Sequence, residues 1–510
     1  MPIRLRKALL LALAAALLLG VSFVQQSLNR DREELGLTRA APLENAPPVL
    51  AFTTVALGGF RGLISNALWM RATELQDEDK FFEMVQLADW ITKLEPHFPQ
   101  VWIMQAWNMA YNISVKFKDF ADRWRWVQRG IELLRDEGLR YNPNDVLIYR
   151  ELAWFFQHKM GANLDDANMY YKQQWANEMA KVFSKAKPDL DELINPRTDD
   201  GKRRAALLSD KFKMDPALMK ELDQRYGPLE WRLPEASAIY WAAVGLEKAK
   251  ENPTKVDRND LIQLRRVIYQ SMQLSFQRGR LVADPIAKRF ELGPNLEIIP
   301  KVSAAYEQAM EEDEKNRDNI RRAHRNFLRD AVYFLYGYNR EMEAAKWFKY
   351  LATKYPKDNL ITGDTNSLPA NMTLETYALA RLQEDVSETS RDRIKAVLEE
   401  LMFNRFRSLL LDEDDRAEGF WLLATKVYQR YERETASSGE RIRIPPLEEI
   451  QRDVLDRLLD PQAGLLPEYR ARLRTKLGMP PETIPPATNA PPGAVVPPAT
   501  YVPAARTTEM

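Results

Sequence analysis

The chain contains no cysteine among its 510 residues and only three histidines. The lack of cysteine excludes disulfides, thiolate zinc sites, thiol nucleophiles and lipid attached to a cysteine. His97, His158 and His324 lie far apart in the sequence, and none has a ligand partner four residues later, so we interpret them as ordinary core or surface residues. No HExxH pair, phosphate-binding glycine loop, G-x-S-x-G elbow or GxGxxG fingerprint is present. The sequence therefore predicts a protein that is not an enzyme and that has no cofactor and no metal site.

The chain also has no excess of charge, because 73 basic residues balance 73 acidic ones. A balanced chain has no overall field that attracts nucleic acid. Two acidic runs, Glu311–Glu314 and Asp412–Asp415, suggest paired acids for glycoside hydrolysis or a calcium loop. Neither run has the spacing of a known site, and we interpret both as solvated surfaces. We predict no nucleic-acid partner.

Glycine is scarce as well, with 20 residues, and runs of β-branched residues are few. Long stretches are rich in Ala, Leu, Glu, Lys, Arg, Gln and Met, which are good helix formers. Apolar residues make up 45% of the chain, which is ample for a folded body. The predicted fold class is all-α.

The N-terminal residues are typical of a targeting segment. Arg4, Arg6 and Lys7 precede an apolar run over residues 8–24, which as a helix spans roughly 25 Å, near the lower limit for crossing a bilayer. The basic flank predicts a single-pass anchor with the body outside the cytoplasm, which is the periplasm in a Gram-negative cell. The alternative is a signal peptide, cleaved near Gly20–Ser22, that releases the body into the same compartment.

The rest of the chain divides by composition. Residues 25–50 are polar and then proline-containing, which indicates a linker. Helical periodicity over 51–185 and 236–478 predicts two helical arrays, separated by a proline-broken, polar insertion or joint at 186–235. Residues 479–510 are rich in proline and predict a disordered tail.

A recurring pattern marks the first helix of each unit. Leu68, Arg71, Ala72 and Leu75 have offsets of zero, three, four and seven, so that a small residue lies between bulky ones on one helix face. The same offsets recur at Trp102, Gln105, Ala106 and Met109, at Tyr149, Leu152, Ala153 and Phe156, and at Leu328, Ala331, Val332 and Leu335. The small residue predicts close approach of a neighbouring helix.

A second helix in the unit has its own pattern and ends at a proline. Met84, Ala88, Ile91 and Pro96 have the offsets that Ala344, Phe348, Leu351 and Pro356 repeat. Proline does not continue a helix, so it closes one unit before the next. These segments resemble tetratricopeptide repeats, which are helix–turn–helix units of about 34 residues that stack into a superhelix. The clearest matches are 65–98, 99–145, 146–188 and 325–358, and the resemblance implies a helix-hairpin α-solenoid. The stretch from Gly59 to Asn112 also resembles exported bacterial repeat proteins of uncharacterised activity.

The resemblance also implies a binding groove. Trp107 and Trp154 each follow the leading bulky residue of their repeat by five positions, which in the family faces the concave side. The same resemblance places further residues in the groove: Gln100, Ile103, Tyr111, Arg150 and Gln157. Tyrosine, tryptophan and arginine are common at binding hot spots. The alternative is that local insertions turn these rings into the core.

Three functions fit these features. The first is a membrane-tethered scaffold outside the cytoplasm that binds a protein or peptide partner in an envelope complex. The second is a protein that binds or handles an envelope polysaccharide through an aromatic-lined groove. The third is a purely structural subunit of a larger membrane complex.

Overall fold

The computed structural model describes residues 60–481, except 184–187, 252–255, 285–288, 386–390, 436–443 and 462–463, together with 16–17, 20–24, 26–28 and 30–31. The described residues are mostly helical, which confirms the all-α prediction. They form two compact units, of which the first reaches Thr389 and the second begins at Ser390. The boundary at Ser390 was not predicted, because helical periodicity continues on both sides of it.

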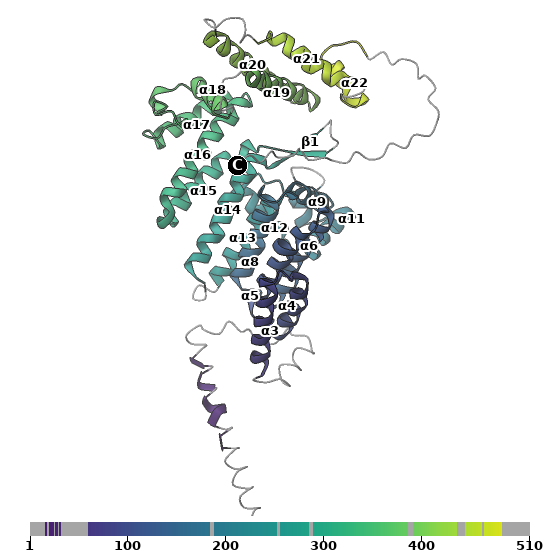
Figure 1. The fold of residues 1–510 in the computed structure, drawn as a ribbon, viewed down its shortest axis with the longest axis vertical. Helices are drawn as coiled ribbons and strands as arrows, with labels where there is room; N and C mark the ends of the chain where they lie inside the picture. Colours follow the sequence, from purple (N-terminus) through teal and green to yellow (C-terminus); the bar gives the residue numbers. More distant parts are fainter. Residues whose placement is uncertain are drawn as a thin grey trace, which may run out of the picture. The chain divides into compact units, whose positions relative to one another are not determined.

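The predicted first array consists of long helices that are arranged as hairpins (Figure 1). Three of them are interrupted by π-helical or 3-10 turns and continue through them: 99–116, 120–141 and 146–161. The elements are α3 (Phe60–Asp77), α4 (Phe81–Leu94), α5 (Pro99–Trp107), η2 (Asn108–Ile113), η3 (Ser114–Lys116), α6 (Phe120–Glu132), η4 (Leu133–Gly138), α7 (Leu139–Tyr141), α8 (Val146–Trp154), η5 (Phe155–Gly161) and α9 (Asn168–Ala180).

The segment 186–235 is helical over much of its length, so the prediction of an irregular insertion was wrong in part. It forms α10 (Leu190–Ile194), α11 (Asp199–Asp210) and α12 (Pro216–Tyr226). The side chains of Asp189, Thr198 and Asp215 each accept a backbone N–H at the start of one of these helices. Pro216 occupies the first turn of α12, where a missing N–H costs nothing. Prolines that we interpreted as helix breakers therefore lie at helix starts and ends.

The first unit continues through further helix pairs and one short β-hairpin, which was not predicted. The elements are α13 (Pro234–Glu251), α14 (Arg258–Arg278), β1 (Arg280–Asp284), β2 (Arg289–Gly293), η7 (Leu296–Ile298), α15 (Ile299–Glu312), η8 (Glu314–Asn316), α16 (Arg317–Gly337), α17 (Glu341–Lys354), η9 (Pro369–Asn371) and α18 (Leu374–Asp385). Strands β1 and β2 pair antiparallel, with Arg280 opposite Gly293. In the second unit, α19 (Arg391–Leu410) packs against α20 (Asp414–Thr435), α21 (Leu447–Leu459) and α22 (Pro467–Lys476).

Two helix-to-helix turns have the same geometry at equivalent repeat positions. Asp79, between α3 and α4, and Asn339, between α16 and α17, both adopt a left-handed backbone with φ near 58°. In each turn the following N–H bonds back to the carbonyl of the leucine at offset seven, Leu75 or Leu335, at 2.8 Å. This 6→1 bond is the usual way to close a helix end. The turns support the sequence register in units more than 200 residues apart.

The small residues of the repeat pattern lie at helix contacts, as predicted. Ala72 and Ala344 are almost fully buried, and the other patterned alanines are too: Ala88, Ala106, Ala153 and Ala331. Most helices pack against the next one in the chain, and α8 also packs against α5 and α13. The helices α10, α11 and α12 are therefore inserted between two neighbours, α8 and α13, that contact each other directly.

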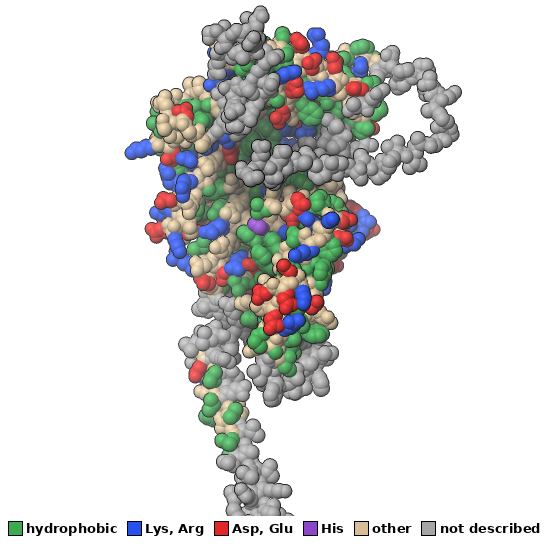
Figure 2. Space-filling view, in the orientation of Figure 1, with side chains coloured by type: hydrophobic (Ala, Val, Ile, Leu, Met, Phe, Trp, Pro, Cys, Tyr) green, Lys and Arg blue, Asp and Glu red, His purple; other side chains and the backbone are tan. Residues whose placement is uncertain are grey.

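The predicted tether falls mostly outside the described residues, as do the linker and nearly all of the tail. Among the residues that the structure describes, no helix is long and apolar enough to cross a membrane. Figure 2 shows acidic and basic side chains intermingled over the face in view, in keeping with the balanced charge of the sequence.

Candidate functional site

Four aromatic rings from two neighbouring helices form one cluster in the first unit. Trp107 stacks on Tyr111 with ring centroids 4.2 Å apart, and Trp154 stacks on His158 at 4.5 Å. The pairs meet where the Tyr111 hydroxyl lies 3.3 Å from Nδ1 of His158. Both pairs have a four-residue spacing, which places side chains on one helix face. We call Trp107, Tyr111, Trp154 and His158 the four-ring cluster.

Trp107 is the most exposed ring of the cluster, with 36% of its surface accessible, whereas the other three are partly buried. Its position is fixed from three sides. Besides the stack on Tyr111, it meets Phe155 edge-on at 6.2 Å, and its Nε1–H donates to Oε2 of Glu151 at 2.8 Å. A large ring is thus held in one orientation and still faces solvent.

Ion pairs tie the cluster to α14. Arg150 donates from Nη2 to Oε1 of Glu151 at 2.7 Å and from Nη1 to Oδ1 of Asp260 at 2.7 Å. Glu151 is buried, and it also receives the Trp107 hydrogen bond. Arg150 was predicted to line the binding groove. The structure instead places it between α8 and α14, where it positions the carboxylate that holds Trp107.

Gln157 does not line an open groove, so that prediction was wrong. Its side chain is buried, and its Nε2 donates to the carbonyl of Val267 at 3.1 Å. The reason is that α14 packs against η5 and covers this face of the helix. Of the two remaining predicted residues, Gln100 is exposed and Ile103 is half-buried in α5.

A buried ionic network lies beneath the rings. Lys159 donates to Oδ2 of Asp165 at 2.6 Å, and both side chains are less than a tenth exposed. The Lys159 ammonium also lies 5.0 Å from the centre of the Tyr111 ring, and Arg123 donates to Asp165 at 3.2 Å. Burial lowers the pKa of Lys159 despite this partner. Burial acts to raise the pKa of Asp165, but hydrogen bonds from Lys159 and the Ala167 backbone outweigh it and lower that pKa.

The polar groups of the cluster favour their neutral forms. Burial raises the pKa of the Tyr111 phenol well above its usual value, and the charge of Glu151 adds to the shift. Burial lowers the pKa of His158, and the charge of Lys159 adds to it. Nε1 of Trp154 is buried and makes no hydrogen bond of normal geometry within the described residues, although its N–H near the Tyr111 hydroxyl acts to lower the Tyr111 pKa. The cluster therefore offers uncharged rings beside one carboxylate.

Both helices widen into a π-helical turn directly after their tryptophan. η2 begins at Asn108, one residue after Trp107, and η5 begins at Phe155, one residue after Trp154. π-helical turns are rare in proteins, and those that do occur are often found at functional sites. The extra residue in the turn rotates the following side chains, and Tyr111 and His158 lie within these turns.

Sequence reasoning missed three residues of this site: Glu151, His158 and Lys159. His158 follows Trp154 by four residues, as Tyr111 follows Trp107, and that spacing could have identified it. No local signal relates Arg150 to Asp260, because 110 residues separate them. The other two histidines lie elsewhere. Nδ1 of His97 contacts the Tyr141 carbonyl at 2.9 Å, and His324 is fully buried between α15 and α17.

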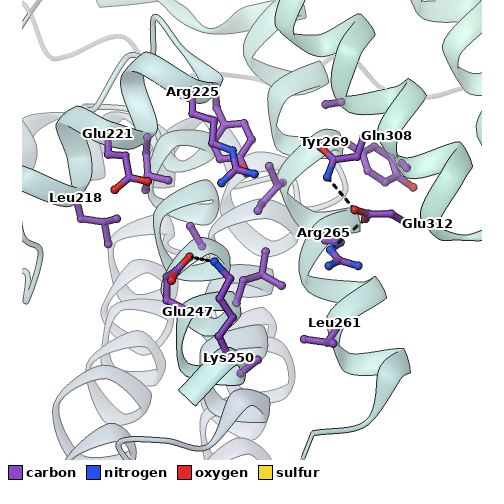
Figure 3. A pocket seen from close by; sticks show the side chains of 18 of the residues that line it. Leu218, Glu221, Arg225, Glu247, Lys250, Leu261, Arg265, Tyr269, Gln308 and Glu312 are labelled. Atoms are coloured by element: carbon purple, nitrogen blue, oxygen red, sulfur yellow. Dashed lines mark hydrogen bonds and ion pairs between the residues drawn. The ribbon is translucent and has the colours of Figure 1, made fainter. Parts of the chain in front are cut away.

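A separate pocket of about 300 Å³ lies in the first unit between α12, α13, α14 and α15 (Figure 3). Its walls are largely apolar, and charged side chains of both signs surround it. No predicted site residue lines it, and one of its walls comes from the insertion that was predicted to be irregular.

Comparisons with protein-family models, with curated proteins and with solved structures found no match for this chain. The four-ring cluster and the pocket are therefore the features that bear on function.

Proposed function

We propose that the chain is a non-enzymatic helical scaffold, similar to tetratricopeptide repeat proteins, that binds a protein or peptide partner at the four-ring cluster. The observation that carries the proposal is Trp107, a large ring that is over a third exposed and yet fixed by stacking, an edge contact and a hydrogen bond. Rings held rigidly before binding lose little entropy when a partner covers them. Tryptophan and tyrosine are also the side chains most often found at binding hot spots.

The order of helix contacts supports a repeat scaffold. In Figure 1 the helices of the first unit follow one another from α3 through α8, α13 and α14 to α16. Contacts run mainly between successive helices, and equivalent turns recur at Asp79 and Asn339. A stack of this kind exposes an extended surface relative to its length, which suits protein binding. We infer a helix-hairpin solenoid interrupted by the insertion α10–α12.

The chemistry around Trp107 indicates the kind of partner. The exposed ring offers apolar contact, and the buried Glu151 carboxylate beside it is already bonded to Trp107 and Arg150. A partner segment with an apolar or aromatic anchor would cover the ring and gain from the excluded water. A segment whose only feature is charge would find no free partner group among these residues.

The test is crosslinking in native cells followed by mass spectrometry, with two matched tryptophan variants. Trp107→Ala should abolish recovery of a stoichiometric protein partner. Trp90→Ala removes a tryptophan that is 46% exposed on α4, and should leave recovery unchanged. Equal recovery from both variants would place the binding surface elsewhere. Recovery only of a glycan polymer, lost in Trp107→Ala, would favour the polysaccharide function, which the same exposed ring supports through stacking on sugar.

We further propose that residues 8–24 tether the scaffold to a membrane with its body outside the cytoplasm. The support is the basic flank followed by an apolar run of bilayer length. A reporter enzyme that works only outside the cytoplasm, fused at the C-terminus, should be active. Activity of a cytoplasmic reporter alone would contradict this topology. A mature chain that starts near Phe23 would replace the anchor by a cleaved signal peptide and leave export intact.

A further inference from the structure

The pocket between α12 and the array has small residues in two of its walls. Ala243 on α13 and Ala309 on α15 line it together with Ile268 on α14 and Leu222 on α12. All four side chains are less than a tenth exposed. Two alanines leave a space where larger residues would fill the gap, and the result is an apolar pocket of about 300 Å³. That volume is near the lower end of the range for small-molecule sites.

The wall formed by α12 is fixed in place. The backbone N–H of Asp215, at its start, donates to the Tyr240 hydroxyl at 2.7 Å. At its end, the Lys301 ammonium donates to the carbonyls of Asp223 and Gln224 at 3.2 and 2.7 Å. Trp231, a few residues later, is fully buried and holds the segment in the core. The pocket is therefore preformed, and α12 is not a loose lid.

The charges around the pocket are not equivalent. Lys250 donates to Glu247 at 2.6 Å, and Arg265 pairs with Glu312 at 3.1 Å, so these cations already have carboxylate partners. Arg225 lies 5.1 Å from the centre of the neighbouring Tyr226 ring.

Within the described part of the chain, no carboxylate lies in ion-pair range of Arg225. Figure 3 shows Arg225 reaching from α12 over the middle of the pocket, with Glu221 toward one side.

We propose that this pocket binds a small amphipathic carboxylate, whose apolar body lies against Leu222, Ala243, Ile268 and Ala309 and whose carboxylate pairs with Arg225. The guanidinium presents a planar pair of donors that matches a carboxylate. The apolar walls supply contact area for a short hydrocarbon body. This site is separate from the four-ring cluster, so it does not depend on the proposed partner binding.

The test uses three probes with one hydrocarbon chain and different head groups: octanoate, octylammonium and 1-octanol, titrated calorimetrically at pH 7.5 below their aggregation limits. Octanoate should bind most tightly. Arg225→Gln should weaken octanoate by at least about tenfold, because a charge-assisted pair is lost, and should leave 1-octanol unchanged. Glu221→Gln is the matched control on the same helix face. It should leave octanoate equal or slightly tighter, because a nearby negative charge is removed.

A filling variant tests the apolar wall. Ala305 is half-buried at the edge of the pocket, and Ala305→Leu should reduce the binding of all three probes. Melting curves of each variant check that the fold is intact, since Arg225 and Glu221 are both exposed. The proposal is overturned if no probe binds the full chain, if octylammonium binds best and loses affinity in Glu221→Gln, or if Arg225→Gln binds octanoate as the parent does.

Discussion

Two histidine–tyrosine contacts of the first unit, each between different helices of the stack, lie in opposite environments. In the region 99–161, His158 contacts the Tyr111 hydroxyl at 3.3 Å beside the exposed Trp107. In the region 299–355, His324 lies between the Tyr355 hydroxyl at 2.8 Å and the Ser303 hydroxyl at 2.9 Å, with all three side chains buried. The first pair forms part of a surface, whereas the second is a core contact.

The comparison shows that the repeat pattern predicts burial only for residues at its own offsets. Tyr149 and Leu328 are the leading bulky residues of their repeats, and the rings five residues later, Trp154 and Tyr333, are both half-buried. The two histidines lie at different offsets. His158, nine residues after Tyr149, is half-buried in the π-helical turn η5, whereas His324, four residues before Leu328 in the regular helix α16, is fully buried.

The largest expected effect is the loss of unfolding free energy when the core tryptophan of α5 is removed, compared with the loss when its surface tryptophan is removed. Trp102 is 3% exposed, stacks on Tyr141 at 5.6 Å and donates to the Pro96 carbonyl at 2.8 Å. Trp102→Ala should cost about 3–5 kcal/mol of unfolding free energy. Trp107→Ala should cost much less, because its ring is partly solvated. Denaturant unfolding of both variants measures the difference, and equal losses would mean that Trp107 is a core residue.

A second prediction concerns pH and distinguishes the two histidines. Burial lowers the pKa of His324 to about 4, against about 6.5 in an unfolded chain. As the pH falls, His324 therefore takes up a proton in the unfolded chain before it does so in the folded protein. The contribution of neutral His324 to the free energy of unfolding is complete above pH 6.5 and is lost as the pH falls toward 4. The shift corresponds to about 3 kcal/mol. Unfolding of the parent and of His324→Gln between pH 7.5 and 4 should show a shallower pH dependence in the variant.

Carboxylates also titrate between pH 7.5 and 4 and change the stability of both proteins. The effect of His324 is therefore the difference in unfolding free energy between the parent and His324→Gln at each pH. His158→Gln is the control, because burial also lowers the pKa of His158 but the side chain is only partly buried, whereas His324 is fully buried. It should change the pH dependence less than His324→Gln does. Identical curves for the parent and His324→Gln would contradict the buried, neutral state of His324.

A third prediction tests the repeat register in the second region. Ala344 is fully buried where α17 meets α16. Ala344→Trp should overpack this contact and cost about 1–3 kcal/mol or more. Ala345→Trp is the control, because Ala345 is exposed on the same helix and should tolerate the ring. If both variants melt as the parent does, the packing of α17 is misassigned.

The smallest expected effect is that of the tail. Residues 482–510 lie outside the described residues, and their proline-rich composition predicts little buried apolar surface. Removing them should leave the melting temperature unchanged. A clear drop would mean that the tail docks on one of the two units.

The helices were predictable because their signals are local. Ala72 and Ala344 mark close helix contacts, and Pro96 and Pro356 follow the ends of their helices, as the spacing predicted. Pro216 misled the prediction, because the same residue type ends one helix and begins another, and only the Asp215 cap distinguishes the two.

The site was predictable in part. Trp107, Tyr111 and Trp154 do come together, since their spacing within each helix is regular. Gln157 and Arg150 were misplaced because α14, more than 100 residues later, packs over them. Contacts of that range depend on how the hairpins stack, and no local pattern encodes them.

The most direct test of the proposed binding surface is site-specific photo-crosslinking in native cells. A photoreactive phenylalanine replaces Ile103, four residues before Trp107 on the same face of α5, in one protein and Met342, which is 89% exposed on α17, in another, and Trp107 is kept in both. We expect an adduct of one defined mass from position 103 and none from position 342. The same adducts from both positions, or none from position 103 in a folded protein, would contradict the proposed binding surface.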